Sequence, residues 1–324
     1  MIFIKINFNS KILKRVFISG AAGFIGSNLC DRFLMEGYYV YGVDNLLTGL
    51  YDNISHLESD NNFEFIEHDI TKHIEFNDKL DFVLHFASPA SPIDYLKYPI
   101  ETLKANAIGG YNLLGLAKKN NSKFILASTS EVYGDPLEHP QNENYYGNVN
   151  PVGPRSIYDE SKRFMESMTK SYNGYYNLNT SIIRIFNTYG PRMKLDDGRV
   201  LPSFIKQASI NNSITINGDG NQTRSFCYID DLIDGIMKLI NIDYNLPVNL
   251  GNDDEVSINY VANKIINLLN SSSKIVYNKL PKDDPLKRKP DISVAKKLLD
   301  WKPKINKEIG FKMLIEYYKK NNLI

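Results

Sequence analysis

A glycine-rich turn directly after a short apolar run places the strongest constraint on the fold of this chain. Gly20-Ala-Ala-Gly23-Phe-Ile-Gly26 follows Arg15-Val-Phe-Ile18 and leads into a segment whose apolar residues recur at helical spacing. Glycines at these positions permit a tight strand-to-helix turn, and the backbone can then approach a pyrophosphate whose charge the helix N-terminus stabilises. The turn therefore predicts a dinucleotide-binding βαβ unit.

Strands and helices alternate through the first half of the chain. Expected strands, rich in β-branched and aromatic residues, lie at 15–18, 39–43, 63–66, 82–84, 123–126 and 181–185. Helical periodicity lies between them at 24–35, 99–118 and 156–172. This alternation implies parallel crossovers, so we predict an α/β fold: a Rossmann-type doubly wound parallel sheet with a smaller C-terminal lobe.

The rhythm changes after about residue 190, where Pro and Gly interrupt the pattern. Helices are expected near 230–241, 258–270 and 294–299. We expect a dinucleotide-binding domain over residues 12–190, to which a later strand and helix return. The lobe over 191–324 is expected to bind mainly the substrate.

Composition excludes several partners. The chain of 324 residues has 38 Lys and Arg against 37 Asp and Glu, so no overall field favours nucleic acid or an anionic membrane. Its two cysteines, Cys30 and Cys227, predict neither a disulfide framework nor a metal site. Lysines within the first 14 residues break the apolar core that a signal peptide needs, so we interpret this stretch as a short extension and expect a cytoplasmic protein.

The acidic residue after the second strand selects the dinucleotide. Asp44 lies 18 positions beyond Gly26, where a carboxylate can accept hydrogen bonds from a ribose. Asn45 follows it with no arginine alongside, so a 2′-phosphate would meet an uncompensated negative charge. We therefore predict NAD rather than NADP. Asp69, after the third strand, is a further candidate for the adenine, or else a helix N-cap.

Tyr158-Asp-Glu-Ser-Lys162 begins a long amphipathic helix, on which residues four apart share a face. A tyrosine ionises near pH 10, so it acts as a base at neutral pH only where a cation favours the phenolate. Lys162, one turn after Tyr158, can supply that charge.

Several longer stretches carry a family resemblance. They are HFASPASP (85–92), LASTSEVYGDP (126–136), NPVGPRSIYDESKR (150–163), RIFNTYGPRM (184–193), DDGRV (196–200) and DDPLKRKPDI (283–292). With the glycine turn, they resemble the extended short-chain dehydrogenase/reductase superfamily and, within it, the UDP-glucuronate decarboxylases, also called UDP-xylose synthases.

This resemblance implies an activity. Such enzymes oxidise C4 of UDP-glucuronate with NAD, lose carbon dioxide from the resulting 4-keto sugar, and reduce C4 with the same cofactor to give UDP-xylose. It implies that Tyr158 is the base, that Lys162 binds the nicotinamide ribose, and that Thr129 binds the C4 oxygen. Glu131 would act near C5, and Arg288 would approach the substrate near its carboxylate.

The resemblance also implies the remaining contacts of the site. Cofactor contacts are expected at Gly20, Gly23, Phe24, Ile25, Gly26, Asp44, Asn45, Thr48, Gly49, Asp69, Ile70, Phe86, Ser88, Ala127, Tyr158, Lys162 and Thr188. UDP-glucuronate is expected to contact Lys104, Asn112, Ser130, Tyr172, Tyr175, Asn187, Arg192, Arg199, Arg224 and Arg288. Of these, Arg192, Arg199 and Arg224 are expected near the UDP diphosphate and its sugars, where guanidinium forks suit phosphate. Lys194 stands where the family often has histidine.

Other activities were weighed. A nucleotide-sugar 4,6-dehydratase carries an acid where this chain has Ser130, and a UDP-sugar 4-epimerase has no use for Arg288. An NAD-sensing binding module without activity is disfavoured because Thr129, Glu131, Tyr158 and Lys162 are all present. The resemblance further implies a homodimer formed by the helices at 99–118 and 156–172.

Overall fold

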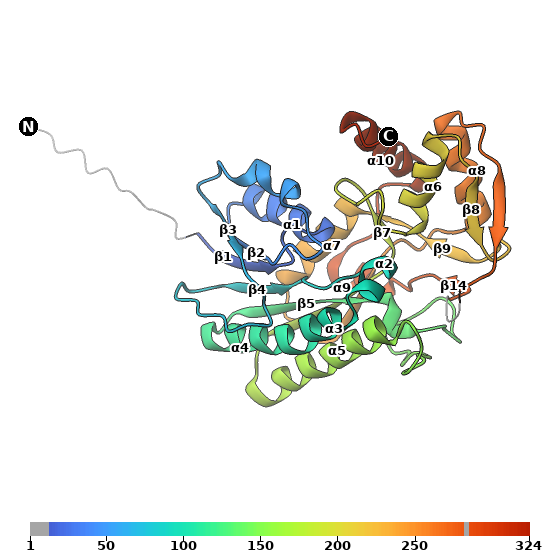
Figure 1. Cartoon of the computed structure of the whole chain (residues 1–324). Helices are drawn as coiled ribbons and strands as arrows, with labels where there is room; N and C mark the ends of the chain where they lie inside the picture. Colours follow the sequence, from blue (N-terminus) through green and yellow to red (C-terminus); the bar gives the residue numbers. More distant parts are fainter. Residues whose placement is uncertain (1–12, 282–284) are drawn as a thin grey trace, which may run out of the picture.

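The computed structural model describes residues 13–281 and 285–324 (Figure 1). The expectation of a short N-terminal extension concerns mainly residues 1–12, which lie outside this part. Asp283 and Asp284 of the 283–292 stretch also lie outside it.

A seven-stranded parallel sheet forms the centre of the molecule, in the order β3-β2-β1-β4-β5-β6-β11. The chain order reverses between β1 and β4, which is the switch point of a doubly wound sheet. The predicted fold class is therefore confirmed. The strands are β1 (Arg15–Ser19), β2 (Tyr39–Asp44), β3 (Phe63–Glu67), β4 (Phe82–His85), β5 (Lys123–Thr129), β6 (Thr180–Ile185) and β11 (Pro247–Leu250).

Helices cover both faces of this sheet (Figure 1). On one face lie α1 (Phe24–Met35), α7 (Ile229–Ile240) and α9 (Ser293–Leu299); on the other lie α3 (Pro99–Lys104), α4 (Gly110–Asn120) and α5 (Ser156–Tyr176). Successive strand residues point to opposite faces. Val16 accordingly packs in the core beneath α1 and Phe17 in the core beneath α4 and α5.

The helix expected at 99–118 is interrupted by a wider, π-type turn, η3 (Ala105–Gly109). Asn106 in this turn is buried and donates hydrogen bonds to the hydroxyl oxygens of Ser88 and Ser161 at 2.9 and 3.1 Å. Such turns are often found at functional sites. Here the turn connects the loop after β4 to the helix that carries Tyr158 and Lys162.

The chain beyond β6 forms a second group of short elements, to which α7, α9 and β11 do not belong because they pack on the central sheet. Three small sheets pair β7 with β10, β9 with β12 and β14, and β8 with β13. The elements are β7 (Thr188–Tyr189), α6 (Val200–Ser209), β8 (Ile214–Asn217), β9 (Thr223–Ser225), β10 (Cys227–Tyr228), β12 (Glu255–Ser257), α8 (Ile258–Leu269), β13 (Ile275–Asn278), β14 (Lys287–Arg288) and α10 (Lys307–Lys320). Short connecting elements elsewhere are η1 (Tyr51–Asn53), η2 (Ser55–Leu57), α2 (Pro92–Lys97) and η4 (Ser130–Tyr133).

Both cysteines are buried free thiols, and burial raises the pKa of each. Within the described residues, no helix combines the length and the apolar character that a membrane crossing requires.

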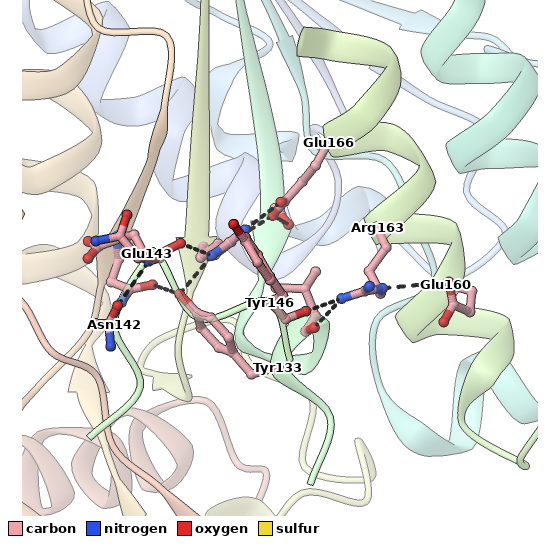
Figure 2. Close-up of polar contacts among 12 residues, drawn as sticks. Tyr133, Asn142, Glu143, Tyr146, Glu160, Arg163 and Glu166 are labelled. Atoms are coloured by element: carbon pink, nitrogen blue, oxygen red, sulfur yellow. Dashed lines mark hydrogen bonds and ion pairs between the residues drawn. The ribbon is translucent and has the colours of Figure 1, made fainter. Parts of the chain in front are cut away.

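A polar network supports the segment that follows β5 (Figure 2). The Arg184 guanidinium donates to both carboxylate oxygens of Glu166 at 2.9 and 2.8 Å and to the hydroxyl of Tyr133 at 2.9 Å. Arg163 donates to the backbone carbonyls of Val132 and Tyr146 at 2.9 and 2.7 Å. Because α5 and β6 supply the arginines, the short turn η4 is held against the same helix that carries Tyr158.

Candidate active site

A cavity of about 620 Å³ opens at the carboxyl ends of the central strands. Its wall includes the glycine turn after β1, the residues that end β5, the start of α5 and the segment from Arg192 to Leu201. Ligands of doubly wound folds bind at this edge, near the switch point. The cavity is therefore the candidate active site.

The glycine turn fits a dinucleotide pyrophosphate. Gly20 has a φ of +77°, and a Cβ there would lie 2.7 Å from the backbone nitrogen of Ala87; a Cβ on Gly26 would lie 2.0 Å from the Gly20 carbonyl oxygen. α1 begins after Gly23 with no side-chain cap, so its first backbone N–H groups are available to an anion.

The side chain of Asp44 is hydrogen-bonded to the backbone of this turn. Its carboxylate accepts hydrogen bonds from the backbone nitrogens of Ala22 at 3.0 Å and Leu46 at 2.9 Å. Burial raises the pKa of Asp44, and the backbone donors and the Lys194 charge act in the opposite direction. The carboxylate therefore lies beside the turn, on the cofactor side of the cavity.

The other predicted cofactor residues divide into two groups. Those in the cavity wall are Phe24, Ile25, Thr48, Phe86, Ser88, Ala127 and Thr188. Asn45, Gly49, Asp69 and Ile70 lie outside it, around the ends of β2 and β3. There Asn45 and Asp69 accept hydrogen bonds from the backbone two residues on, and Gly49 lies against Asp44.

Tyr158 and Thr129 meet in the cavity wall, from α5 and the end of β5, and their side chains are hydrogen-bonded. The Tyr158 ring is stacked on Tyr95, with centroids 5.4 Å apart. Burial raises the pKa of Tyr158 to about 12, although the Arg199 charge and the Thr129 hydrogen bond lower it. Arg199 is thus a cation whose charge lowers the pKa of Tyr158, whereas the sequence indicated Lys162 for this role.

Lys162 is buried and donates from Nζ to the Ala127 carbonyl oxygen at 2.9 Å, with Nζ 5.8 Å from the centre of the Tyr158 ring. Burial lowers the pKa of Lys162 to about 7. Burial therefore disfavours the charged form of Lys162.

Glu131 is held between two arginines. Arg155 forms an ion pair with one carboxylate oxygen of Glu131, and Arg288 donates to the same oxygen at 3.1 Å. Burial acts to raise the pKa of Glu131, but the charges of Arg288, Arg155 and Arg224 outweigh it and lower the pKa. Glu131 is consequently ionised. It can take up a proton only if its ion pairs with these arginines are weakened.

Arg288 was predicted to approach the substrate, and this contact stays a prediction. The side chain is 2% exposed and lies outside the cavity wall. Its guanidinium also donates to the carbonyls of Ser130 at 2.6 Å and Gly134 at 2.9 Å. Arg288 therefore holds the backbone around η4 and the carboxylate of Glu131 from the side that faces away from the cavity.

The predicted substrate residues in the wall are Ser130, Asn187, Arg192, Arg199 and Arg224. Arg199 donates to Asp197 and to the Ala90 carbonyl, at 2.6 and 2.9 Å. Arg192 forms an ion pair with Asp31 of α1 and lies beside the Asn53 carbonyl. Arg192 therefore lies on the glycine-turn side, where the cofactor pyrophosphate is expected, rather than with the substrate arginines.

Four predicted substrate contacts lie outside the cavity: Lys104, Asn112, Tyr172 and Tyr175. Asn112 instead donates to the carbonyls of Ile70 and Lys72, at 2.8 and 3.1 Å. Tyr172 lies 14 residues after Tyr158 on one helix, which is about 20 Å at 1.5 Å per residue. Tyr175 is 83% exposed. The four residues therefore lie away from the cavity wall, and their contacts with the substrate stay predictions.

The wall also includes residues that were not predicted as contacts, among them Tyr95, Arg155 and Lys194. Arg155 lies three residues before Tyr158, within the NPVGPRSIYDESKR stretch, and that position was the available signal. Tyr95 gave no such signal, because its stacking on Tyr158 depends on the packing of α2 against α5.

Comparison with known proteins agrees with this geometry. A model of the NAD dependent epimerase/dehydratase family matches residues 16–251. The chain is 46% identical over 312 residues to UDP-glucuronic acid decarboxylase 1 of Xenopus tropicalis, covering 96% of this chain and 74% of that protein. The chain belongs to the UDP-glucuronic acid decarboxylase family. UDP-glucuronic acid decarboxylase 5 of Arabidopsis thaliana is 45% identical, with 96% of this chain and 92% of that protein covered.

Solved structures of related enzymes share the fold. UDP-glucose 4-epimerase from Thermotoga maritima, with UDP-glucose, has a TM-score of 0.85 at 27% identity and covers 95% of this chain and 99% of its own. UDP-glucuronic acid 4-epimerase from Bacillus cereus, with UDP-glucuronic acid and NAD, has a TM-score of 0.84 at 29% identity, with the same coverage. The decarboxylase family thus shares its fold with epimerases, one of which binds the same sugar nucleotide.

Proposed function

We propose that this enzyme decarboxylates UDP-glucuronate to UDP-xylose and carbon dioxide, through a UDP-4-keto sugar, with NAD regenerated in each turnover. The observation that carries the proposal is the position of Glu131, which is held ionised by arginines beside the Thr129, Tyr158 and Lys162 group. Identity of 46% to a decarboxylase over nearly the whole chain supports the same reaction.

Each residue of the site has its own role in this reaction. Tyr158, hydrogen-bonded to Thr129, takes the proton of the sugar C4 hydroxyl and later returns it. NAD, when bound, would supply hydride transfer from and to C4. The glycine turn and Asp44 hold the cofactor, and Lys162 orients the Tyr158 side of the site. Glu131 and Arg155 form the part of the wall at which the carboxylate of the sugar is lost, and Arg288 holds Glu131 in place.

Decarboxylation is favoured chemically once C4 is a ketone. The carboxylate is then β to a carbonyl, so the electrons of the C5–C6 bond have an acceptor. The enolate that results is protonated at C5. Arginines near Glu131 fit this step because they stabilise negative charge as it moves from the carboxylate to the enolate.

The second candidate is a 4-epimerase, favoured by the similarity to the UDP-glucuronic acid 4-epimerase from Bacillus cereus. An epimerase returns hydride to the opposite face of the same sugar and keeps the carboxylate. Incubation with UDP-glucuronate and trapping of released carbon dioxide separates the two reactions. Carbon dioxide in step with substrate loss supports the proposal, and UDP-galacturonate without carbon dioxide contradicts it. A 4,6-dehydratase remains disfavoured because Ser130, not an acid, lies in the wall.

We also propose a homodimer formed through α3, α4 and α5. These helices and the turn η3 between α3 and α4 expose apolar side chains that a second copy would cover: Ile100, Leu103, Ile108, Tyr111, Phe164 and Tyr175. Exposed apolar surface of this extent marks an association site. A cytoplasmic location is proposed as well, and the two free thiols fit a reducing compartment.

A further inference from the structure

A second, smaller cavity lies beside the active site. It measures about 210 Å³, and its wall includes Asp135, Asn148, Asn150, Arg155 and Asp159. Arg155 also lines the large cavity and is ion-paired with Glu131. One guanidinium therefore connects the wall of the active site with the small cavity.

Asp159 is the buried acid of this small cavity. It is 5% exposed, and its Oδ1 has no hydrogen-bond partner among the residues that the structure describes. Its backbone nitrogen donates to the Arg155 carbonyl at 3.1 Å. Burial and the Glu131 charge raise the pKa of Asp159 to about 7, against the opposing charges of Arg155 and Arg288. A carboxyl group in this state exchanges its proton near neutral pH.

The charges around Asp159 can be counted from the elements that face it. Glu131 comes from η4, Arg155 from the turn before α5, Arg288 from β14 and Glu160 from α5 itself; Arg224 of β9 acts on Glu131. Glu160 is exposed and paired with Arg163. Asp135, an exposed acid, lines the same cavity. An anionic substrate group beside Glu131 would add a further negative charge near Asp159, which favours its protonated form in the same way as the Glu131 charge does.

Decarboxylation consumes a proton. The C5–C6 bond breaks, its electron pair moves into the 4-keto group, carbon dioxide leaves, and a new C5–H bond needs one proton from outside the sugar. The hydride cycle supplies none, because the proton taken from the C4 hydroxyl returns to it. The C5 proton therefore comes from solvent. A site that acquires a separate proton together with the substrate carboxylate keeps its net charge unchanged on binding, and it must lose that proton when the carboxylate leaves as carbon dioxide.

We propose that Asp159 takes up a proton from solvent through the small cavity when the carboxylate of the substrate binds, and returns it to solvent by the same route when carbon dioxide leaves. Asp159 acts through Arg155 and does not touch the sugar, so it is a positioning residue. This inference rests on the proposed function, because it requires the substrate carboxylate to lie near Glu131.

Calorimetry can measure the uptake directly. UDP-glucuronate is titrated into the NAD-loaded Tyr158→Phe enzyme, in which the base is removed, in buffers of different ionisation enthalpy and about one pH unit above the pKa of Asp159. Uptake of up to about one proton per site is expected with UDP-glucuronate, and little with UDP-xylose, which lacks the carboxylate. Adding Asp159→Asn should abolish the uptake. Glu160→Gln, an acid on the same helix, and Asp135→Asn, an exposed acid of the same cavity, should retain it.

Proton uptake that persists in the Asp159→Asn variant would overturn the proposal. Loss of proton uptake in Glu160→Gln or Asp135→Asn to the same extent as in Asp159→Asn would also overturn it. If Asp159→Asn does not fold, infrared spectroscopy of protein labelled with ¹³C-aspartate tests the proposal instead, through the band of protonated aspartic acid. It should strengthen on addition of UDP-glucuronate to the Tyr158→Phe enzyme, and an unchanged band would refute the assignment. Carbon dioxide release by the wild-type enzyme, measured first, tests the proposed function separately. With that function intact, the high-pH limb of the wild-type rate profile should be absent from Asp159→Asn.

Discussion

Arg288 donates a hydrogen bond of 2.6 Å to the carbonyl oxygen of Ser130, a residue 158 positions earlier in the chain. The same guanidinium donates to the Glu131 carboxylate at 3.1 Å. The short strand β14 therefore fixes the turn that follows β5, and with it the carboxylate in the active-site wall. A residue remote in sequence thus determines the orientation of Glu131.

Replacing Arg288 should affect both stability and activity. Arg288→Ala leaves Glu131 with fewer partners, and removing one member of a buried ion pair costs about 3 kcal/mol in unfolding free energy. Denaturant unfolding measures this cost. Adding Glu131→Gln should recover part of the stability but none of the decarboxylase activity. If Arg288→Ala loses activity with no change in stability, a direct contact with substrate would replace the positioning role.

Lys162 should make stability depend on pH. Its pKa is lowered to about 7 in the folded protein, whereas the ordinary value is near 10.5. Between these values the unfolded chain binds more protons than the folded one, so this lysine makes stability rise with pH from about 7 to about 10.5. Lys162→Met should flatten the rise, measured by denaturant unfolding across that range. Lys170→Met, an exposed lysine of the same helix, is the control and should retain the slope.

Asp44 should select NAD. Its carboxylate accepts from two backbone nitrogens beside the glycine turn, so a 2′-phosphate there would meet a negative charge. Calorimetry or fluorescence should show binding of NAD at least about tenfold tighter than NADP, which is about 1.4 kcal/mol. Asp44→Asn keeps an acceptor oxygen for the backbone of the turn but removes the negative charge. It should therefore reduce the difference in affinity between NAD and NADP. Equal affinities in the wild-type protein would contradict this role for Asp44.

The proposed dimer can be disrupted by a charge on its apolar surface. Tyr111 of α4 is 58% exposed and lies among the apolar residues of this face. Tyr111→Glu should convert a dimer to a monomer in light scattering, because burying an unpaired carboxylate is costly. Met35→Glu is the matched control, since Met35 is 82% exposed on α1, away from α3 to α5. A wild-type monomer, or dissociation of both variants alike, would contradict the proposed interface.

The parts of the site that depend on local sequence could be predicted. Gly20 follows β1 directly, Gly26 lies in the first turn of α1, and Asp44 ends β2. The spacing of Tyr158 and Lys162 places both on one helix face. The parallel, doubly wound sheet followed from the alternation of strands and helices, and the structure adds the strand order.

The rest depends on contacts between distant segments. The direction of Arg288 is set by the pairing of β14 with β9, and the ion pair of Arg192 by its approach to α1. Tyr172 and Tyr175 share a helix with Tyr158 but lie several turns beyond it, at a distance that motif matching does not measure. For Asp159, the sequence showed an acid beside the tyrosine, and only the packed structure shows its burial and its cavity.

The most direct test of the proposed reaction is a nuclear magnetic resonance time course of UDP-glucuronate with the enzyme and NAD in deuterated water. UDP-xylose should appear as substrate disappears, with carbon dioxide in equal amount and deuterium at C5, because the proton consumed comes from solvent. Tyr158→Phe should be slower by about 10²–10⁴-fold, the usual contribution of a general base. Formation of UDP-galacturonate with its carboxylate retained would contradict the account.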